Sequence, residues 1–391
     1  MLAPDTLLAD AGLVLSNTLN RPVSLVEPTV LESEGLVLRA RVDPDGFGPE
    51  AVVVKRVTDT TFDQPGHRGP PQRFLNEWAA LEFLTSLGLG GEACPTLLCA
   101  DVEGGFLVLG DLGGLVDLQT VLLSDQPRLA RAGLVDMGRT LGRIHATTHD
   151  IEGRFHDLQV SLGTGSPRCD STVDQRTREE VFSSCLRSLA IAPETGFWDA
   201  VVRIESMIHD QTPFWALIHA DAGPQNFLVA DGGGALVDFE YAVYRNGLCD
   251  VVGARLGFPQ TTRAMTVSAA DAARVETAYR EAVSTVIPQA GDDSVFFSSL
   301  TAAGGHWALN RWAAAWRRQV GPLLESGREP GDGEISALSS TLLVLDGFVA
   351  LAGETGTFPE IAGTVASFVA QIHRRWPEVR PPPGYPALRN G

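Results

Sequence analysis

The sequence is almost without lysine: Lys55 is the one lysine, beside 29 arginines, in a chain of 391 residues. Basic residues of both kinds are outnumbered, 30 against 48 acidic ones, which gives a formal net charge of −18 at pH 7. Such a surface repels phosphate backbones and anionic lipids, so nucleic-acid and membrane partners are not expected. The lone lysine is either a survivor of compositional drift or a position where a planar guanidinium cannot replace a compact ammonium.

Cysteine is scarce and scattered, with five residues and no C-x-x-C pair, which favours reduced thiols over a disulfide framework or a zinc site. Long apolar runs are also missing. The longest, 342–352, is interrupted by Asp346 and Gly347 and is too short to cross a bilayer. The first residues lack the basic segment of a secretory signal. Together these absences predict a cytoplasmic protein.

Apolar residues are abundant, at 44% against 20% charged, which excludes a largely disordered chain. The length suits two domains or one two-lobed unit. In the first part of the chain, the alternating segment 36–42 and the apolar run 51–57 flank a dense turn and predict a β-hairpin. Apolar residues at helical spacing predict a helix over 73–87, and 104–110 is predicted as a short strand.

Beyond residue 110 the pattern is mainly helical. Helices are predicted at 129–147, 177–191, 198–209, 269–286, 298–320 and 335–352. Two short apolar strands, 215–219 and 227–239, interrupt them. The predicted fold class is therefore α+β, with a small antiparallel-sheet lobe at 1–109 and a larger, mainly helical lobe at 110–391.

The interruption holds the polar residues best suited to chemistry. Asp221 and Asn226 bracket the loop between the two strands, and Asp238 follows the second strand. Asp and Asn favour turns for conformational reasons, but that preference explains this spacing poorly. Their oxygens suit Mg²⁺, which commonly takes one or two carboxylates plus phosphate oxygens. We expect the two strands to be adjacent, with Asp221 facing an acceptor hydroxyl and Asn226 and Asp238 facing the metal.

The run His-Ala-Asp-Ala-Gly-Pro-Gln-Asn at 219–226, followed by Val-Asp-Phe-Glu at 237–240, resembles the aminoglycoside phosphotransferase and choline kinase family. The family's H-G-D-x-x-x-x-N loop and its following I-D-[FW]-E segment match in order and spacing. The resemblance covers roughly residues 30 to 255 and implies a two-lobed protein-kinase-like fold. It implies that the lobe at 1–109 binds nucleotide and that the lobe at 110–391 carries catalysis and substrate binding. It also implies that Asp221 is the catalytic base and that Asn226 and Asp238 hold Mg²⁺.

On the nucleotide side, Lys55 is similar to the family lysine that contacts the α- and β-phosphates. Glu77 sits where the family helix supplies the partner of that lysine, although Glu82 is a competing candidate. The segment 106–112 resembles the hinge strand whose backbone receives adenine, which implies nucleotide contacts at Asp111 and Leu112.

No G-x-G-x-x-G phosphate loop is present, so the segment 31–35, with Ser33 and Gly35, must take its place. The implied cofactors are ATP, or GTP, and Mg²⁺. Two further departures are Ala220, where the family has glycine, and Gly223, where it often has histidine. His145 resembles a helical family position before the catalytic loop, and Asp250 resembles the acidic residue that follows the metal-binding aspartate.

Several single residues keep alternative interpretations. His219, on a strand end, is expected to be a structural histidine that bonds backbone near Asp238, and Glu240 either orders the metal segment or caps the strand. Trp312 and Trp316 share a helix face and are expected to pack in the core, with an aromatic wall for a cationic ligand as the alternative. The acidic loop 325–334 either attracts a polycationic sugar or is a solvated connector.

These observations predict an ATP-dependent phosphotransferase that acts on a hydroxyl of a small molecule. The expected acceptors include aminoglycosides and other cationic molecules, and antibiotic resistance is one expected role. Choline, homoserine, a sugar or a nucleoside-like antibiotic are alternative acceptors, and the protein is expected to be a monomer or homodimer. A catalytically silent nucleotide-binding regulator is the alternative from another class. The intact set of Lys55, Asp221, Asn226 and Asp238 argues against that alternative.

Overall fold

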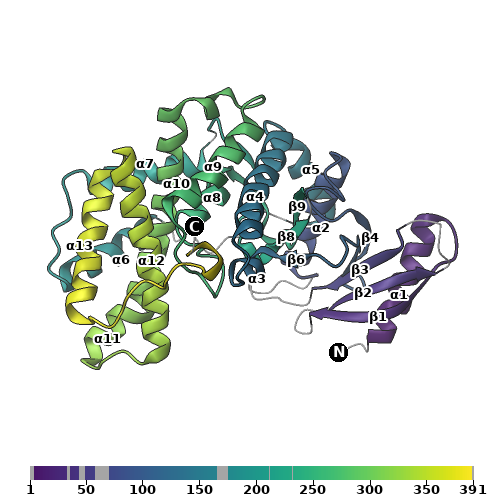
Figure 1. Ribbon diagram of the computed structural model, residues 1–391, viewed down its shortest axis with the longest axis horizontal. Helices are drawn as coiled ribbons and strands as arrows, with labels where there is room; N and C mark the ends of the chain where they lie inside the picture. The colour runs from purple at the N-terminus through teal and green to yellow at the C-terminus, as the bar shows by residue number, and fades with distance from the viewer. Residues whose placement is uncertain are drawn as a thin grey trace. The chain divides into compact units, whose positions relative to one another are not determined.

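The computed structural model describes residues 4–32, 36–43, 49–57, 70–164, 175–210, 212–230 and 232–389 (Figure 1). The chain divides into two compact units. The first unit comprises Met1–Val116, Ile151–Arg168 and Leu228–Val243, and the second comprises Asp117–Asp150, Cys169–Phe227 and Tyr244–Gly391. The lobe boundary after residue 109 stays a prediction.

A five-stranded antiparallel sheet forms the centre of the first unit, in the order β1-β2-β3-β5-β4. Its strands are β1 (Ser24–Glu32), β2 (Val37–Asp43), β3 (Ala51–Arg56), β4 (Leu97–Asp101) and β5 (Phe106–Gly110). The predicted hairpin is present as β2 and β3, where Val37 pairs with Lys55. Because β3 is the middle strand and also pairs Lys55 with Leu107, the position of this lysine is fixed from both sides.

Helix α1 (Pro4–Leu19) covers one face of the sheet and was not foreseen from the sequence (Figure 1). Apolar residues of α1 form one buried cluster with alternate residues of β2 and β3, among them Leu38, Val52 and Val54. Side chains alternate between the two faces of a strand. Lys55 follows Val54 directly and therefore points to the face opposite α1.

Helix α2 (Gln72–Ser86) and the segment after strand β8 (Phe227–Ala230) also belong to the first unit, and both carry polar residues of the candidate site. Helix α2 packs against helix α5 (Glu152–Leu162) and against the 3₁₀ turn Phe239–Tyr241. The apolar segment 227–239 is divided into strand β8, strand β9 (Gly233–Leu236) and this turn. Strand β8 lies between β9 and the short strand β6 (Val116–Asp117).

The expectation that the strands around the loop 219–226 are adjacent was wrong. Strand β7 (Trp215–Ile218) pairs with β10 (Val243–Asn246), whereas β8 belongs to another sheet. The physical reason lies in the loop, where Ala220 has a φ of +65° and a 3₁₀ turn follows at Pro224–Asn226. This backbone is longer and more irregular than a tight hairpin turn, so it leads the chain from one sheet into the next.

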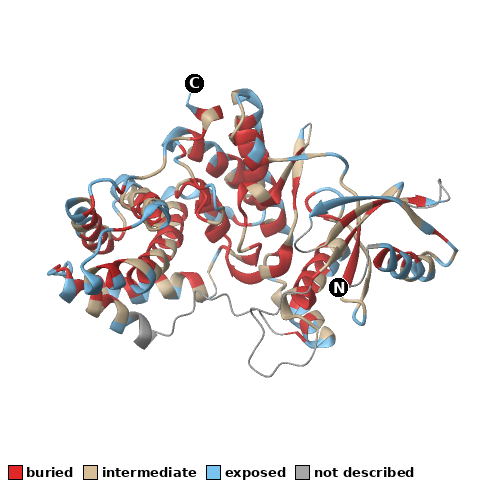
Figure 2. Ribbon diagram, turned by 90° about the horizontal axis from the view of Figure 1, so that it is seen from below, coloured by how far each residue is buried: buried red, intermediate tan, exposed pale blue. Residues whose placement is uncertain are grey.

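The second unit is mainly helical, as predicted, with buried residues along the facing sides of its helices (Figure 2). Its helices are α3 (Leu118–Leu122), α4 (Pro127–Thr148), α6 (Gln175–Ser188), α7 (Phe197–His209), α8 (Leu248–Val251), α9 (Ala269–Val283), α10 (Asp293–Ala315), α11 (Gly321–Ser326), α12 (Asp332–Thr355) and α13 (Pro359–Arg375). A π-helical stretch, Trp316–Val320, joins α10 to α11.

The apolar run 342–352 is part of the 24-residue helix α12, which is long and apolar enough to cross a membrane by length and composition alone. Half of its most apolar window is buried within the protein. Helix α12 packs against both α10 and α13, which is the packing of a core helix.

Helices α4 and α9 approach each other closely because glycines lie at their contact. A Cβ atom on Gly138 would lie 2.4 Å from the carbonyl oxygen of Val275, and one on Gly142 would lie 2.6 Å from the Cβ of Ala282. Glycine inside a helix costs about 1 kcal/mol relative to alanine, so its presence here has a packing reason. The contact fixes α4, which carries His145, against α9, which carries Tyr279.

We therefore expect Gly138→Ala to lower the free energy of unfolding by about 1–3 kcal/mol, because the added methyl group overpacks the contact. Gly353, exposed in α12 with no atom within 4 Å of an added Cβ, provides the control. Gly353→Ala should be neutral or stabilising by up to about 1 kcal/mol. Thermal and denaturant unfolding of both variants compares the two, and equal stabilities would contradict the close contact.

Candidate active site

Lys55 is the cation of a polar cluster in the first unit. Its Nζ lies 2.8 Å from Glu77 Oε1 and 2.7 Å from Glu77 Oε2, and it also forms an ion pair with Asp238. Burial lowers the pKa of Lys55, but the charges of Glu77 and Asp238 outweigh this effect and raise its pKa above the ordinary value. The ammonium is therefore charged across the physiological range, and Glu77, which is 1% exposed, has the counter-charge that a buried carboxylate requires.

Helix α2 positions Glu77 and also binds the segment that contains Asp238. The Nδ2 of Asn76 donates to the carbonyl oxygens of Glu240 and Ala242, both at 3.0 Å. Asn76 is fully buried, and its Oδ1 accepts a hydrogen bond of 3.1 Å from Gln159 Nε2 on α5. One turn of α2 thus determines the positions of both partners of Lys55.

A second contact of α2 assigns a partner to Glu240. Arg73 forms an ion pair with the Glu240 carboxylate, and its guanidinium carbon lies 4.8 Å from the centroid of the Tyr241 ring. Glu240 therefore takes part in ordering the segment after β9. Glu82, the competing candidate, is not the partner of Lys55, which pairs with Glu77 and Asp238. Glu82 is exposed and accepts a hydrogen bond of 2.7 Å from Trp78 Nε1.

Arg73 and Asn76 were missed by the sequence reasoning. The available signal was their spacing, because residues 73, 76 and 77 share one helix face in an otherwise apolar segment. Buried polar residues on such a face must have specific partners.

The remaining candidates of the nucleotide side are Asp111 and Leu112, at the end of β5. The carboxylate of Asp111 accepts two hydrogen bonds from Arg39, of 2.9 Å from Nε and 2.6 Å from Nη2. This side chain therefore links β5 to β2, and the nucleotide contacts expected at Asp111 and Leu112 stay predictions. Ser33 and Gly35 lie outside the described residues.

The loop 219–226 belongs to the second unit, and two of its residues are joined there. The Nδ2 of Asn226 donates to both the backbone oxygen and Oδ2 of Asp221, each at 3.0 Å. The carboxamide is thereby oriented with its nitrogen toward Asp221, which leaves its oxygen Oδ1 as a ligand for a cation.

Asp250 holds the beginning of this loop in place. It is 2% exposed and accepts hydrogen bonds from the backbone N–H groups of His219, at 2.7 Å, and Ala220, at 3.0 Å. His145 Nε2 lies 3.5 Å from its carboxylate, and His145 Nδ1 lies 3.2 Å from the hydroxyl of Tyr279. Burial and the Asp250 charge both raise the pKa of this tyrosine, which stays neutral.

The loop backbone explains the two departures from the family pattern. Ala220 has a φ of +65°, in the left-handed region that glycine adopts without strain, so the family glycine is a conformational requirement that alanine meets at some cost. At Gly223, an added Cβ would lie 2.3 Å from the Oε1 of Gln225, which occupies the space of a side chain at that position. His219 Nδ1 accepts a hydrogen bond of 3.2 Å from the Asp221 N–H, consistent with a structural histidine.

The oxygen donors in both units suit a hard divalent cation such as Mg²⁺. In the first unit, carboxylate oxygens of Glu77, Asp238 and Glu240 lie within 4.8 Å of one another. All three carboxylates are paired with a cation, Glu77 and Asp238 with Lys55 and Glu240 with Arg73. Asp238, whose side chain is 38% exposed, is the most accessible of the three to a further cation. In the second unit, Asn226 offers Oδ1.

The residues expected on the substrate side have other roles. Trp312 is fully buried and packs with its ring centroid 4.8 Å from that of Phe182 and 5.1 Å from that of Phe368. Trp312 is therefore a core residue and not part of an aromatic wall for a cationic ligand. In the acidic loop 325–334, Glu334 pairs with Arg328 at 2.6 Å, so the two charges partly neutralise each other.

Comparison with known proteins agrees with a phosphotransferase, the class to which this fold and the loop 219–226 point. The sequence matches the family described as the phosphotransferase enzyme family over residues 40–283, which is more than half of the chain. The protein therefore belongs to this family, and the predicted protein-kinase-like α+β fold, with a small antiparallel sheet and a mainly helical remainder, is confirmed. No curated protein matches the chain.

Similar solved structures include choline kinase LicA from Streptococcus pneumoniae, with 14% identity, 83% of this chain and 94% of that chain covered, and a TM-score of 0.40. ADP-bound aminoglycoside phosphotransferase APH(2'')-Ib has 12% identity, 83% and 95% coverage, and a TM-score of 0.46. Macrolide 2'-phosphotransferase MphH from Brachybacterium faecium has 16% identity, 82% and 99% coverage, and a TM-score of 0.40.

We expect Asp250→Asn to destabilise the protein, because the amide offers only one acceptor oxygen and leaves one of the two backbone N–H groups without a partner. An unpaired buried donor costs about 1–3 kcal/mol in the free energy of unfolding. Asp125→Asn, at an exposed position, is the matched control. Chemical denaturation measures both, and an Asp250→Asn variant as stable as the control would contradict this role.

Proposed function

We propose that the protein is an ATP-dependent phosphotransferase that uses Mg²⁺ and transfers the terminal phosphoryl group to a hydroxyl of a small molecule. The observation that carries the proposal is the ion pair between the only lysine and the buried Glu77, with Asp238 beside them. A compact ammonium held in this way suits contact with phosphate oxygens. Membership of the phosphotransferase family supports the proposal.

Each polar residue then has a distinct role. Lys55 neutralises charge on the α- and β-phosphates, and Glu77 holds its ammonium in place. Asp238 and Asn226 are the residues that would hold Mg²⁺, whose chemistry is to neutralise charge on the phosphates. Asp221 orients the acceptor hydroxyl and accepts its proton, while the bond from Asn226 fixes the direction of its carboxylate.

For the acceptor, we propose an aminoglycoside or another small molecule with a free hydroxyl, with choline, homoserine, sugars and nucleoside-like antibiotics as members of the test panel. Trp312 does not supply a cation-binding aromatic wall, because its ring is part of the core. Recognition of a cationic acceptor would therefore depend on carboxylates. Membership of the phosphotransferase family supports antibiotic resistance as one proposed setting. The few, scattered cysteines support a proposed cytoplasmic location.

The direct test is consumption of ATP over this acceptor panel in the presence of Mg²⁺. Asp221→Asn should lower kcat by about 10²–10⁴, because it removes the proton acceptor but not the nucleotide contacts. Nucleotide binding, measured by calorimetry, should stay unchanged in this variant. A regulator without activity would bind nucleotide equally in both proteins and would turn over no member of the panel.

Lys55→Arg tests whether shape as well as charge is required. Arginine keeps the positive charge, but its planar guanidinium needs more space beside Glu77. We expect the nucleotide KM to rise and kcat/KM to fall by about 10²-fold or more, as for loss of one charge-stabilising group. Arg56→Lys, at the next position of β3, is the reciprocal control and should have little effect. Equal activity of Lys55→Arg and wild type would contradict the proposed phosphate contact.

A further inference from the structure

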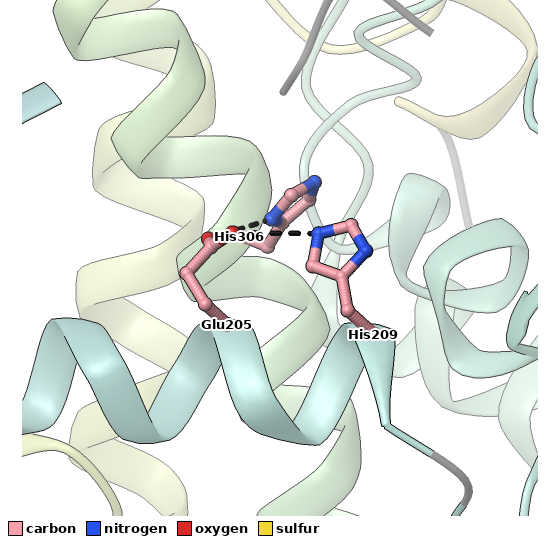
Figure 3. A group of neighbouring side chains, drawn as sticks. All are labelled: Glu205, His209 and His306. Atoms are coloured by element: carbon pink, nitrogen blue, oxygen red, sulfur yellow. Dashed lines mark hydrogen bonds and ion pairs between the residues drawn. The ribbon is translucent and has the colours of Figure 1, made fainter. Parts of the chain in front are cut away.

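Three side chains of types that can ligate a metal ion meet in the second unit, and none of them belongs to the candidate active site. Glu205 and His209 lie four residues apart on α7, and His306 comes from α10, which packs against α7 (Figure 3). Residues at i and i+4 share one face of a helix, so both α7 side chains point toward His306. Figure 3 shows the Glu205 carboxylate facing both imidazole rings, with one interaction to each.

The distances fit a small metal ion. Glu205 Oε1 lies 3.0 Å from His306 Nδ1, and Glu205 Oε2 lies 3.4 Å from His209 Nε2. One ligand atom of each residue lies within 4.8 Å of the other two. A tetrahedral zinc ion with bonds of about 2.0–2.1 Å has ligand–ligand distances of about 3.3–3.4 Å. Small rotations of the side chains are therefore sufficient to bring all three to one ion.

The surroundings of His306 resemble those of metal-bound histidines. This residue is 4% exposed, and its second ring nitrogen, Nε2, lies 3.1 Å from Nδ2 of the Asn310 carboxamide. A metal-ligating histidine typically donates its other N–H to a polar partner, which fixes the ring. A half-turn of the carboxamide exchanges its nitrogen and oxygen positions, and Oδ1 of Asn310 would then accept that N–H and leave the lone pair of Nδ1 for the ion.

A hydrogen-bonded trio without metal is the simpler alternative, in which the carboxylate accepts from both rings. That alternative explains His306 but not His209. The Nε2 atom of His209 is buried and forms no hydrogen bond within the described residues, although it faces the carboxylate at 3.4 Å. A buried nitrogen in this position is better explained as a ligand.

We propose that Glu205, His209 and His306 bind one Zn²⁺ ion, with water at the fourth position. Two imidazole nitrogens and one carboxylate oxygen are a ligand set that suits zinc, and binding releases the protons held between the ligands to solvent. The ion ties the last turn of α7 to α10. The next residue of α10, Trp307, donates from Nε1 to the backbone oxygen of Cys249 at 3.2 Å. Since Cys249 precedes Asp250, the ion stabilises the helix that supports the loop 219–226.

The test uses the full chain, stripped with a chelator and then titrated with ZnCl₂ against a chromophoric competitor. We expect about one zinc per chain and a rise of Tm with zinc, because a ligand that binds the folded state stabilises it. Substitution of Co²⁺ should give the intense visible absorption of a four-coordinate site. Failure of the wild-type chain to bind zinc or to show the Tm shift would overturn the proposal, whatever the phosphotransferase assay gives.

Variants locate the ion. Glu205→Gln and His209→Gln should each abolish the stoichiometric binding and the Tm shift, and His209 is partly exposed, so its replacement is compatible with folding. Asn310→Ala should keep the stoichiometry but weaken zinc affinity about 10–100-fold. His156→Gln, at an exposed histidine of α5, is the control and should bind like wild type. Binding that persists in both ligand variants would place the zinc elsewhere and refute the site.

Discussion

The neutralisation of one buried carboxylate by one ammonium is the constraint on which the first unit depends. Glu77 lies inside the protein, where an unpaired charge would cost several kcal/mol, and the only lysine of the chain supplies its partner. The middle strand of the sheet fixes the lysine, and a turn of α2 fixes the carboxylate. Because the same turn binds the backbone after β9 through Asn76, three segments distant in sequence keep one geometry.

The second unit solves a similar problem with backbone donors in place of a cation. Asp250 is buried, and its charge is met by two N–H groups at the start of the loop 219–226. The two bonds give the beginning of the loop a fixed direction. The strained conformation of Ala220 is compatible with folding because Asp250 accepts hydrogen bonds from the backbone N–H groups of both His219 and Ala220.

Most helices and strands and the catalytic loop could be predicted from the sequence. The contacts that could not be predicted join segments that lie far apart in the chain. The β2–β3 hairpin, α2 and most helices of the second unit follow from apolar periodicity, and the loop 219–226 from its motif. Helix α1 was missed because its capping and periodic signals are weak, and the pairing of β7 with β10 because register between distant segments leaves no local trace. The bonds of Asn76 and Asp250 were hidden for the same reason: each joins residues more than 25 positions apart.

The scarcity of lysine gives the protein an intrinsic spectroscopic label. A chain with one lysine contains a single side-chain amine, and that amine lies between Glu77 and Asp238. Lysine labelled with ¹⁵N would contribute one side-chain ammonium signal, and its shift and exchange rate would report the state of one ion pair. The electrostatics of the buried cluster can thus be followed at a single nitrogen, in the intact protein, without introducing any foreign group.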